Sequence, residues 1–301
     1  MPELPEVETM RRGLAGVAGA RIVAVEFPRS RVRPLVIRPR PAVLGPRLEG
    51  RSITAVLRRG KRILLELSDD APAGTRWLAI EPRMTGLMLV TDPPTAEHVR
   101  LVLHLEPAPR REAPPRILFW DRRGLGTIRL HDRAGLEAAC GPGKLGPDGL
   151  EVTGADLAAR LRTSRRAVKV ALLDQRAVAG IGNIYAAEIL FRAGIDPRTP
   201  CRRLARDVWE RIAAATRQVL AEAVRFEGSS IGDETYRTAD NRAGRFQKRH
   251  RVYGRVDQPC ITCRQPVARV VQAQRATFFC PRCQSRPDTR RRRVAGSGRM
   301  P

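Results

Sequence analysis

Short apolar runs, separated by clusters of Gly, Pro and Arg, fill residues 21–130. They predict strands at 21–27, 52–57, 62–67, 77–80, 87–90, 99–105, 116–120 and 126–130. Many short strands without intervening helices are typical of a sandwich or barrel. In front of them, Val7, Met10, Leu14 and Val17 recur at helical spacing, which predicts an N-terminal helix with one buried stripe.

The pattern changes in the second half of the chain. The stretch "CGPGKLGPDGL" at 140–150 is rich in Gly and Pro and predicts a linker between domains. Helical periodicity follows at 155–162, 168–174, 184–193 and 208–224, interrupted by "GIGN" and "GIDPRTP". Residues 228–250 are polar and contain Gly, which predicts a long loop.

Length and composition favour a globular protein with two domains. The chain has 301 residues, 42% of them hydrophobic, and no apolar run long enough to span a membrane. The first residues lack the order of a secretory signal, so we expect a cytoplasmic location.

Charge indicates the class of partner. The chain has 56 Lys and Arg against 31 Asp and Glu, a formal net charge of +25. A surface of this kind attracts polyanions, and the absence of a basic amphipathic helix favours nucleic acid over membrane. Ribosome-associated proteins and simple DNA-binding modules share this balance, so charge alone does not predict an activity.

Lysine is rare among these cations. Only Lys61, Lys144, Lys169 and Lys248 occur, and an amine can release a proton whereas a guanidinium effectively cannot. "RRGK" predicts a tight hairpin that places Lys61 at or beside its tip.

The cysteine spacing is specific. Cys260, Cys263, Cys280 and Cys283 form two CxxC pairs 16 residues apart, which can present four thiolates to one structural Zn²⁺. A disulfide framework is the alternative, and the expected reducing compartment disfavours it. The residues between the pairs predict two strands with a turn that projects Arg275.

"GIGNIYAAEIL" predicts a helix with Asn183 as its N-cap. The preceding glycines either let backbone N–H groups approach a phosphate or form a close packing corner between helices.

"MPELPEVE" also has two interpretations. Proline and acidic residues suit a helix start. Alternatively, removal of Met1 exposes a secondary amine at Pro2 that can attack a sugar aldehyde carbon, with Glu3 beside it to move protons.

Six stretches taken together resemble the formamidopyrimidine-DNA glycosylase family, which excises oxidised purines. They are "MPELPEVET", "RRGKRILLEL", "RMTG", "AVAGIGNIYAAEILFRAGIDP", "VYGR" and "QRATFFCPRCQ", and the similarity runs from residue 1 to about 285.

The resemblance implies an α+β multidomain fold. The expected parts are an N-terminal catalytic β-sandwich with its helix, a linker, a helix–two-turn–helix DNA-binding domain with a lesion-side loop, a C-terminal β-hairpin zinc finger and a disordered basic tail. Their expected bounds are 1–133, 134–150, 151–250, 251–285 and 286–301.

The resemblance also implies roles for individual residues. Pro2 is the expected Schiff-base nucleophile, Glu3 the proton donor, Lys61 the lysine that assists elimination and Arg275 the residue for δ-elimination. The expected DNA contacts are Met84, which fills the space left by the flipped base, and Arg123, Leu125, Arg165, Lys169, Asn183 and Arg275. The expected partner is damaged double-stranded DNA, with a monomeric chain, no membrane and no small-molecule cofactor.

The chain departs from the family pattern at several places. The family has Pro-Arg-Arg-Phe-Gly where this chain reads "RRGLG", so Gly124 replaces an arginine and Leu125 an aromatic residue. Glu81 and Ala96 stand at usual histidine positions.

These changes concern the opposite-base preference and the wedge, and none of them touches Pro2, Glu3 or Lys61. The expected function is a bifunctional DNA glycosylase and AP lyase that acts on oxidised purines. The alternatives are an oxidised-pyrimidine glycosylase of the endonuclease VIII type and a catalytically silent damage-binding protein.

Overall fold

The computed structural model describes residues 2–68, 74–108, 112–232 and 235–284. The predicted tail at 286–301 lies outside the described residues. The chain forms two compact units. The first consists of Met1–Glu151, Asp174–Gly182 and Arg217–Arg249, and the second of Val152–Leu173, Asn183–Thr216 and His250–Pro301.

The first unit contains two sheets. One has the order β1-β7-β8-β6 and the other the order β2-β9-β5-β4-β3. The first sheet consists of β1 (Arg21–Glu26), β7 (Val99–Glu106), β8 (Arg116–Asp121) and β6 (Gly86–Leu89). The second consists of β2 (Val36–Arg38), β9 (Thr127–His131), β5 (Arg76–Glu81), β4 (Arg62–Leu67) and β3 (Ile53–Arg59). All eight predicted strands are confirmed, whereas β2 was missed because three residues carry no readable period.

Apolar side chains from both sheets meet in one core, which makes this unit a β-sandwich. Ile22 of β1, Leu103 of β7 and Leu65 of β4 are fully buried in it. Helix α1 (Leu4–Gly13) adds Val7 and Met10 to the same core, so the predicted stripe is confirmed.

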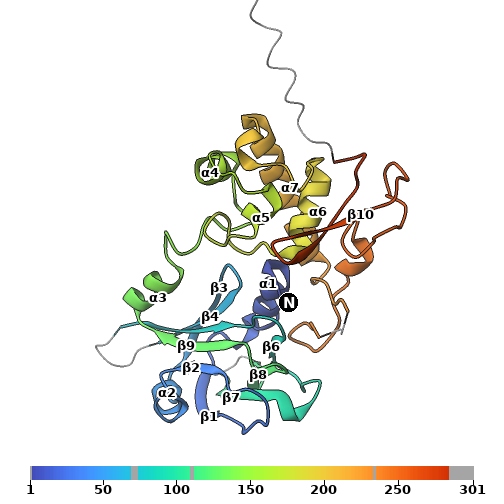
Figure 1. Ribbon diagram of the computed structural model, residues 1–301. Helices are drawn as coiled ribbons and strands as arrows, with labels where there is room; N and C mark the ends of the chain where they lie inside the picture. Colours follow the sequence, from blue (N-terminus) through green and yellow to red (C-terminus); the bar gives the residue numbers. More distant parts are fainter. Residues whose placement is uncertain (1, 69–73, 109–111, 233–234, 285–301) are drawn as a thin grey trace, which may run out of the picture. The chain divides into compact units, whose positions relative to one another are not determined.

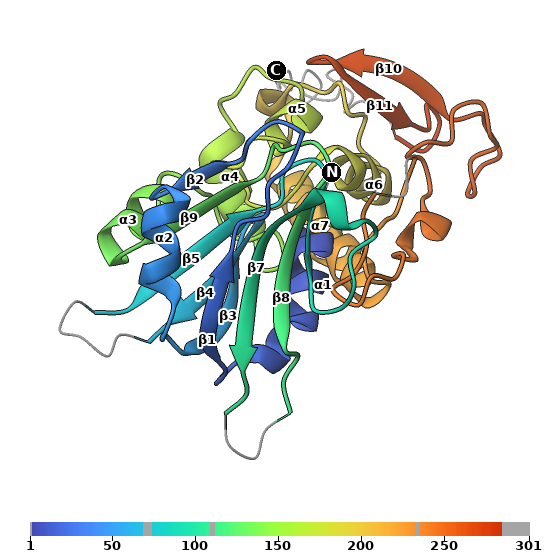
Figure 2. The ribbon, with the colours of Figure 1, turned by 90° about the horizontal axis from the view of Figure 1, so that it is seen from below.

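Short helices complete the first unit. Helix α2 (Pro41–Leu48) lies beside β1 and β2 (Figure 2). Helix α3 (Arg133–Cys140) occupies the start of the predicted linker and packs Leu136 against Trp77 of β5. Sequence patterns did not indicate α3, because its packing partner lies far away in the chain.

The second unit is helical. It contains α4 (Gly154–Leu161), α5 (Val168–Leu172), α6 (Asn183–Ala193) and the first half of α7 (Arg206–Arg225), as the periodicity predicted (Figure 1). Strands β10 (Ala268–Gln272) and β11 (Arg275–Phe279) form its hairpin, and β11 lies against α6. Among the described residues, no helix is long and apolar enough to cross a bilayer.

Candidate active site

The β3–β4 hairpin presents Lys61. Arg59 of β3 pairs with Arg62 of β4, which leaves Gly60 and Lys61 as a two-residue turn. Gly60 has a φ of +57°, a conformation that favours glycine. The prediction that Lys61 lies at the hairpin tip is therefore confirmed.

The start of α1 is buried around Glu3. Pro2 is buried, and Glu3 is only 1% exposed. The backbone N–H of Glu3 donates to the Glu6 carboxylate at 2.8 Å, and that carboxylate also accepts the Ser229 backbone N–H at 2.8 Å. Glu6 thus fixes the first turn of the helix to the loop that follows α7.

Segment Asp174–Gly182 packs against this helix start. The Leu4 backbone N–H donates to the Gly180 carbonyl at 3.0 Å. A Cβ on Gly180 would meet Leu4 Cδ1 at 2.4 Å, and one on Gly182 would meet Glu3 Cδ at 2.3 Å. Both glycines therefore leave room for side chains at the start of α1, Leu4 and the preceding Glu3, which favours the packing interpretation of "GIGN" over a phosphate cradle.

The hairpin tip lies against the same segment. A Cβ on Gly60 would lie 3.4 Å from Ala179 Cβ and 3.9 Å from the Gly180 backbone nitrogen. One segment therefore contacts both the turn that carries Lys61 and the helix that follows Pro2 and Glu3.

Asp121 organises two neighbouring loops. Its fully buried carboxylate accepts hydrogen bonds from Thr85 Oγ1 at 2.5 Å, the Arg123 backbone N–H at 3.1 Å and the Gly126 backbone N–H at 2.8 Å. Thr85 follows Met84, whose side chain is 38% exposed. Asp121 thereby holds the Met84 loop beside the loop of Arg123 and Leu125, a role that the sequence did not reveal.

The structure leaves no room for a side chain at position 124. Its φ is +63°, and a Cβ there would meet the Arg33 carbonyl oxygen at 2.1 Å. Any side chain at this position requires the loop around Arg33 to move. Glu81, at a usual histidine position, pairs with Arg62 and Arg83 at 3.1 Å each, next to Met84.

In the second unit, Lys169, Asn183 and the β10–β11 hairpin form one cluster. Lys169 is fully buried, and its Nζ donates to Asn183 Oδ1 at 2.6 Å, the Ala276 carbonyl at 3.0 Å and Thr277 Oγ1 at 2.7 Å. The Asn183 amide donates to the same Ala276 carbonyl at 3.0 Å. Helix α6 begins at Asn183 itself, and this side chain is directed to the hairpin beside Arg275.

The hairpin tip holds Arg275 in the solvent. Gln272 pairs with Arg275 across a two-residue turn of Ala273 and Gln274, whose φ values are +46° and +59°. Non-glycine residues rarely adopt this conformation, and such strain is concentrated at functional sites. Arg275 and Arg165 are both exposed.

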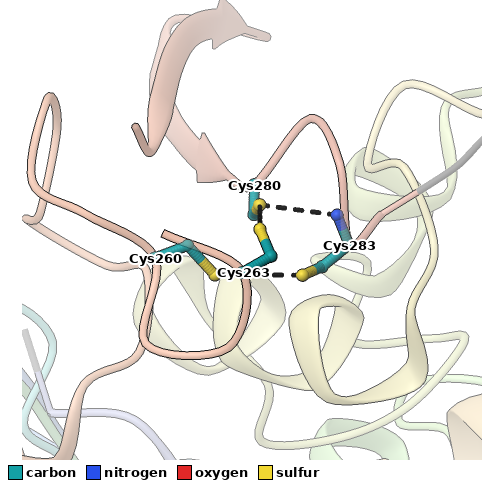
Figure 3. A group of neighbouring side chains, drawn as sticks. All are labelled: Cys260, Cys263, Cys280 and Cys283. Carbon is teal, nitrogen blue, oxygen red and sulfur yellow. Dashed lines mark hydrogen bonds between the residues drawn. The ribbon is translucent and has the colours of Figure 1, made fainter. Parts of the chain in front are cut away.

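The four predicted zinc ligands converge. The Sγ atoms of Cys260, Cys263, Cys280 and Cys283 all lie within 4.8 Å of one another (Figure 3). The Cys260–Cys283 and Cys263–Cys280 sulfur distances are 3.9 and 3.4 Å. A tetrahedral Zn²⁺ with bonds of about 2.3 Å separates its sulfurs by about 3.8 Å. The donor set therefore fits one zinc ion with every position filled by protein.

Glu188 of α6 supports the segment that leads into these cysteines. Its carboxylate accepts the backbone N–H groups of Arg251, Val252 and Tyr253 at 2.8–3.0 Å. Burial raises the pKa of Glu188, and the three hydrogen bonds oppose that rise.

Three family models match the chain. They are the formamidopyrimidine-DNA glycosylase N-terminal domain at residues 1–128, the H2TH domain of the same enzymes at 145–235, and a zinc finger found in FPG and IleRS at 257–286. The formamidopyrimidine-DNA glycosylase of Chloroflexus aggregans is 42% identical over 294 residues, covering 94% of this chain and 98% of the relative. The chain belongs to the formamidopyrimidine-DNA glycosylase family.

Further relatives and solved structures of the formamidopyrimidine-DNA glycosylase family also match the chain over most of its length. The Cereibacter sphaeroides enzyme of that name is 43% identical, covering 94% of this chain and all of the relative. The Thermus thermophilus Fpg structure has a TM-score of 0.79 and 38% identity, covering 95% and 100% of the two chains. A Lactococcus lactis Fpg variant bound to Fapy-dG-containing DNA has a TM-score of 0.81 and 30% identity, with the same coverage.

Proposed function

We propose that the chain is a bifunctional DNA glycosylase and AP lyase of base excision repair that removes 8-oxoguanine and formamidopyrimidines from double-stranded DNA. One observation carries the proposal. Residues Ala179–Gly182 contact both the Lys61 hairpin and the buried helix start that follows Pro2 and Glu3.

The chemistry begins with the amine. After removal of Met1, the Pro2 nitrogen is a secondary α-amine. Because α-amino groups ordinarily titrate at about 8 and lysines at about 10.4, far more of an α-amine than of a lysine is free base at neutral pH. It bonds to C1′ as the glycosidic bond breaks and the base leaves with the bond's electron pair and a proton. Glu3 protonates the ring oxygen as the sugar opens, and loss of the amine proton completes the iminium.

Strand cleavage follows from the iminium. Removal of a C2′ proton expels the 3′ phosphate, and a second elimination expels the 5′ phosphate. Lys61 assists the elimination, and Arg275 serves the second step. Glu3, the proposed proton donor of the first step, is only 1% exposed, so its carboxyl group is shielded from bulk water.

The remaining residues bind DNA. Asn183 and Arg275 clamp phosphate, Arg123 and Arg165 add cations, and Leu125 is the wedge. Met84 fills the space of the flipped base. We assign Lys169 to DNA binding through Asn183, because its buried ammonium already donates to three protein oxygens.

One structural zinc holds the hairpin that carries Arg275. We further propose that the chain acts as a monomer in the cytoplasm, on the nucleoid. Its proposed parts are a catalytic domain, a linker, a DNA-binding domain and a zinc finger, with the bounds predicted above.

Borohydride trapping on abasic DNA tests the lyase, since only a lyase forms a reducible iminium. We expect trapping by the natural protein and slower trapping by Pro2→Gly, which keeps an amine of different basicity. Excision is then compared between 8-oxoguanine and thymine glycol. The absence of any trapped complex would indicate a silent damage-binding protein, and preference for thymine glycol an enzyme of the endonuclease VIII type.

Lys61→Arg tests the role of the amine. The variant keeps positive charge and loses the titratable group, so we expect loss of 8-oxoguanine excision with DNA binding largely kept. Excision at the wild-type rate would mean that Lys61 acts as a charge only.

A further inference from the structure

Arg58 of β3 joins three segments of the first unit. Its side chain is 9% exposed. Nε donates to Glu8 at 3.0 Å, Nη1 to Asp148 at 2.6 Å and to the Gly60 carbonyl at 3.0 Å, and Nη2 to Asp148 at 3.0 Å. The partners belong to helix α1, the Lys61 turn and the chain that follows α3.

Two of the residues bonded to Arg58 lie in elements next to groups of the proposed reaction. Glu8 lies in α1, the helix that begins directly after Pro2 and Glu3. Gly60 is the turn residue next to Lys61, so a fixed Gly60 carbonyl limits how the turn can rotate. A guanidinium holds its donors in one plane and can fix several acceptors at once, which an ammonium on a flexible stem cannot.

Asp148 connects Arg58 to segment Asp174–Gly182, which packs against the start of α1. The backbone on both sides of it bonds to Ala179, from the Ala179 N–H to the Pro147 carbonyl at 2.9 Å and from the Gly149 N–H to the Ala179 carbonyl at 3.0 Å. Ala179 precedes the Gly180–Gly182 stretch that receives Leu4 and Glu3. Arg58 therefore contacts α1 and the Lys61 turn directly, and it is connected to the Ala179–Gly182 stretch through Asp148.

Neighbouring arginines keep Glu8 ionised. Glu8 also accepts hydrogen bonds from Arg11 at 3.0 Å and Arg12 at 2.9 Å. Burial alone would raise the pKa of Glu8, but these hydrogen bonds and the one from Arg58 lower it. The Glu8 carboxylate is thus available as an acceptor at neutral pH.

We propose that Arg58 is a positioning residue that fixes the Lys61 turn relative to the Pro2–Glu3 helix through Gly60, Glu8 and Asp148. The inference rests on the proposed function, because it assigns Arg58 an effect on Lys61. A buried ion pair that only stabilises the fold is the competing interpretation.

A double-mutant cycle distinguishes the positioning role of Arg58 from a purely stabilising ion pair. Single-turnover excision of 8-oxoguanine is measured at saturating enzyme for the natural protein, Arg58→Lys, Lys61→Arg and the double variant. We expect Arg58→Lys to lower the rate about 10- to 100-fold, because a shift of about 1 Å in a catalytic group has an effect of that size. We expect little further loss when Arg58→Lys is added to Lys61→Arg, since coupled residues are not additive.

The controls keep each outcome interpretable. Arg59→Lys changes the next residue of β3, whose exposed side chain pairs with Glu137 at 3.1 Å, and should excise at the natural rate. Asp148→Asn, which keeps the shape of an Arg58 partner, replaces Arg58→Lys in the cycle if that variant does not fold. A natural excision rate for a folded Arg58→Lys, or fully additive losses, would overturn the proposal. A natural rate for Lys61→Arg would instead refute the proposed role of Lys61.

Discussion

Gly182→Ala is a small change with a large expected effect. A Cβ at position 182 would lie 2.3 Å from Glu3 Cδ, 2.4 Å from Oε1 and 2.7 Å from Cγ. Carbon atoms in ordinary contact are about 3.5–4.0 Å apart, so the Glu3 carboxyl must shift by about 1 Å or more. Because Glu3 is 1% exposed, the shift also disturbs its neighbours.

Two magnitudes follow from this overlap. A displacement of about 1 Å in a catalytic group lowers the rate about 100-fold. Forcing an extra methyl group into a packed site reduces the free energy of unfolding by about 1–3 kcal/mol. We therefore expect a folded protein with a lower melting temperature and about 1% of the natural excision rate.

The assay is single-turnover excision of 8-oxoguanine, with thermal unfolding measured on the same samples. Gly16→Ala is the matched control, because a Cβ there meets nothing closer than Pro114 Cδ at 3.9 Å. Glu3→Gln combined with Gly182→Ala should be no slower than the slower single variant if Glu3 carries the effect. A folded Gly182→Ala protein that excises at the natural rate would refute the reasoning.

Three further predictions concern other parts of the chain, and a fourth the metal. Elemental analysis should find one zinc per chain, and a strong chelator should weaken DNA binding; zinc-free pure protein would contradict this. Burial lowers the pKa of His250 from 6.5 to about 4, so between these values only the unfolded chain binds the proton and stability falls as pH falls. From pH 7 to 5, urea unfolding should show the natural protein losing about 2 kcal/mol more than His250→Asn; equal losses would show that His250 titrates normally. Asp121→Asn should lower the melting temperature and weaken binding to lesion-containing duplex, because it leaves a buried donor facing backbone N–H groups. Unchanged binding would mean that the Met84 loop and the Arg123–Leu125 loop keep their arrangement without the Asp121 carboxylate. Leu125→Phe should strengthen discrimination between bases opposite 8-oxoguanine, since a ring stacks over more base surface than an aliphatic wedge. An unchanged opposite-base preference in single-turnover assays would show that another residue discriminates between these bases.

The sequence alone determined the features that depend on local order. Eight strands, four helices and the N-terminal stripe follow from the period of apolar residues, and the Lys61 turn from its Gly between paired strands. The zinc ligands follow from two CxxC pairs, because each pair forms half of a tetrahedral site by itself.

Only the tertiary structure decided which residues surround these groups. Arg58 and Asp148 are 90 positions apart, and no period or spacing in the sequence links them. The glycines of "GIGN" matched two interpretations until Glu3 and Leu4 were found against them. Likewise, only the structure shows that the Arg33 carbonyl oxygen lies where a side chain at Gly124 would be. Such contacts arise from packing between segments distant in the chain, and packing is a property of the folded structure that residue order does not display.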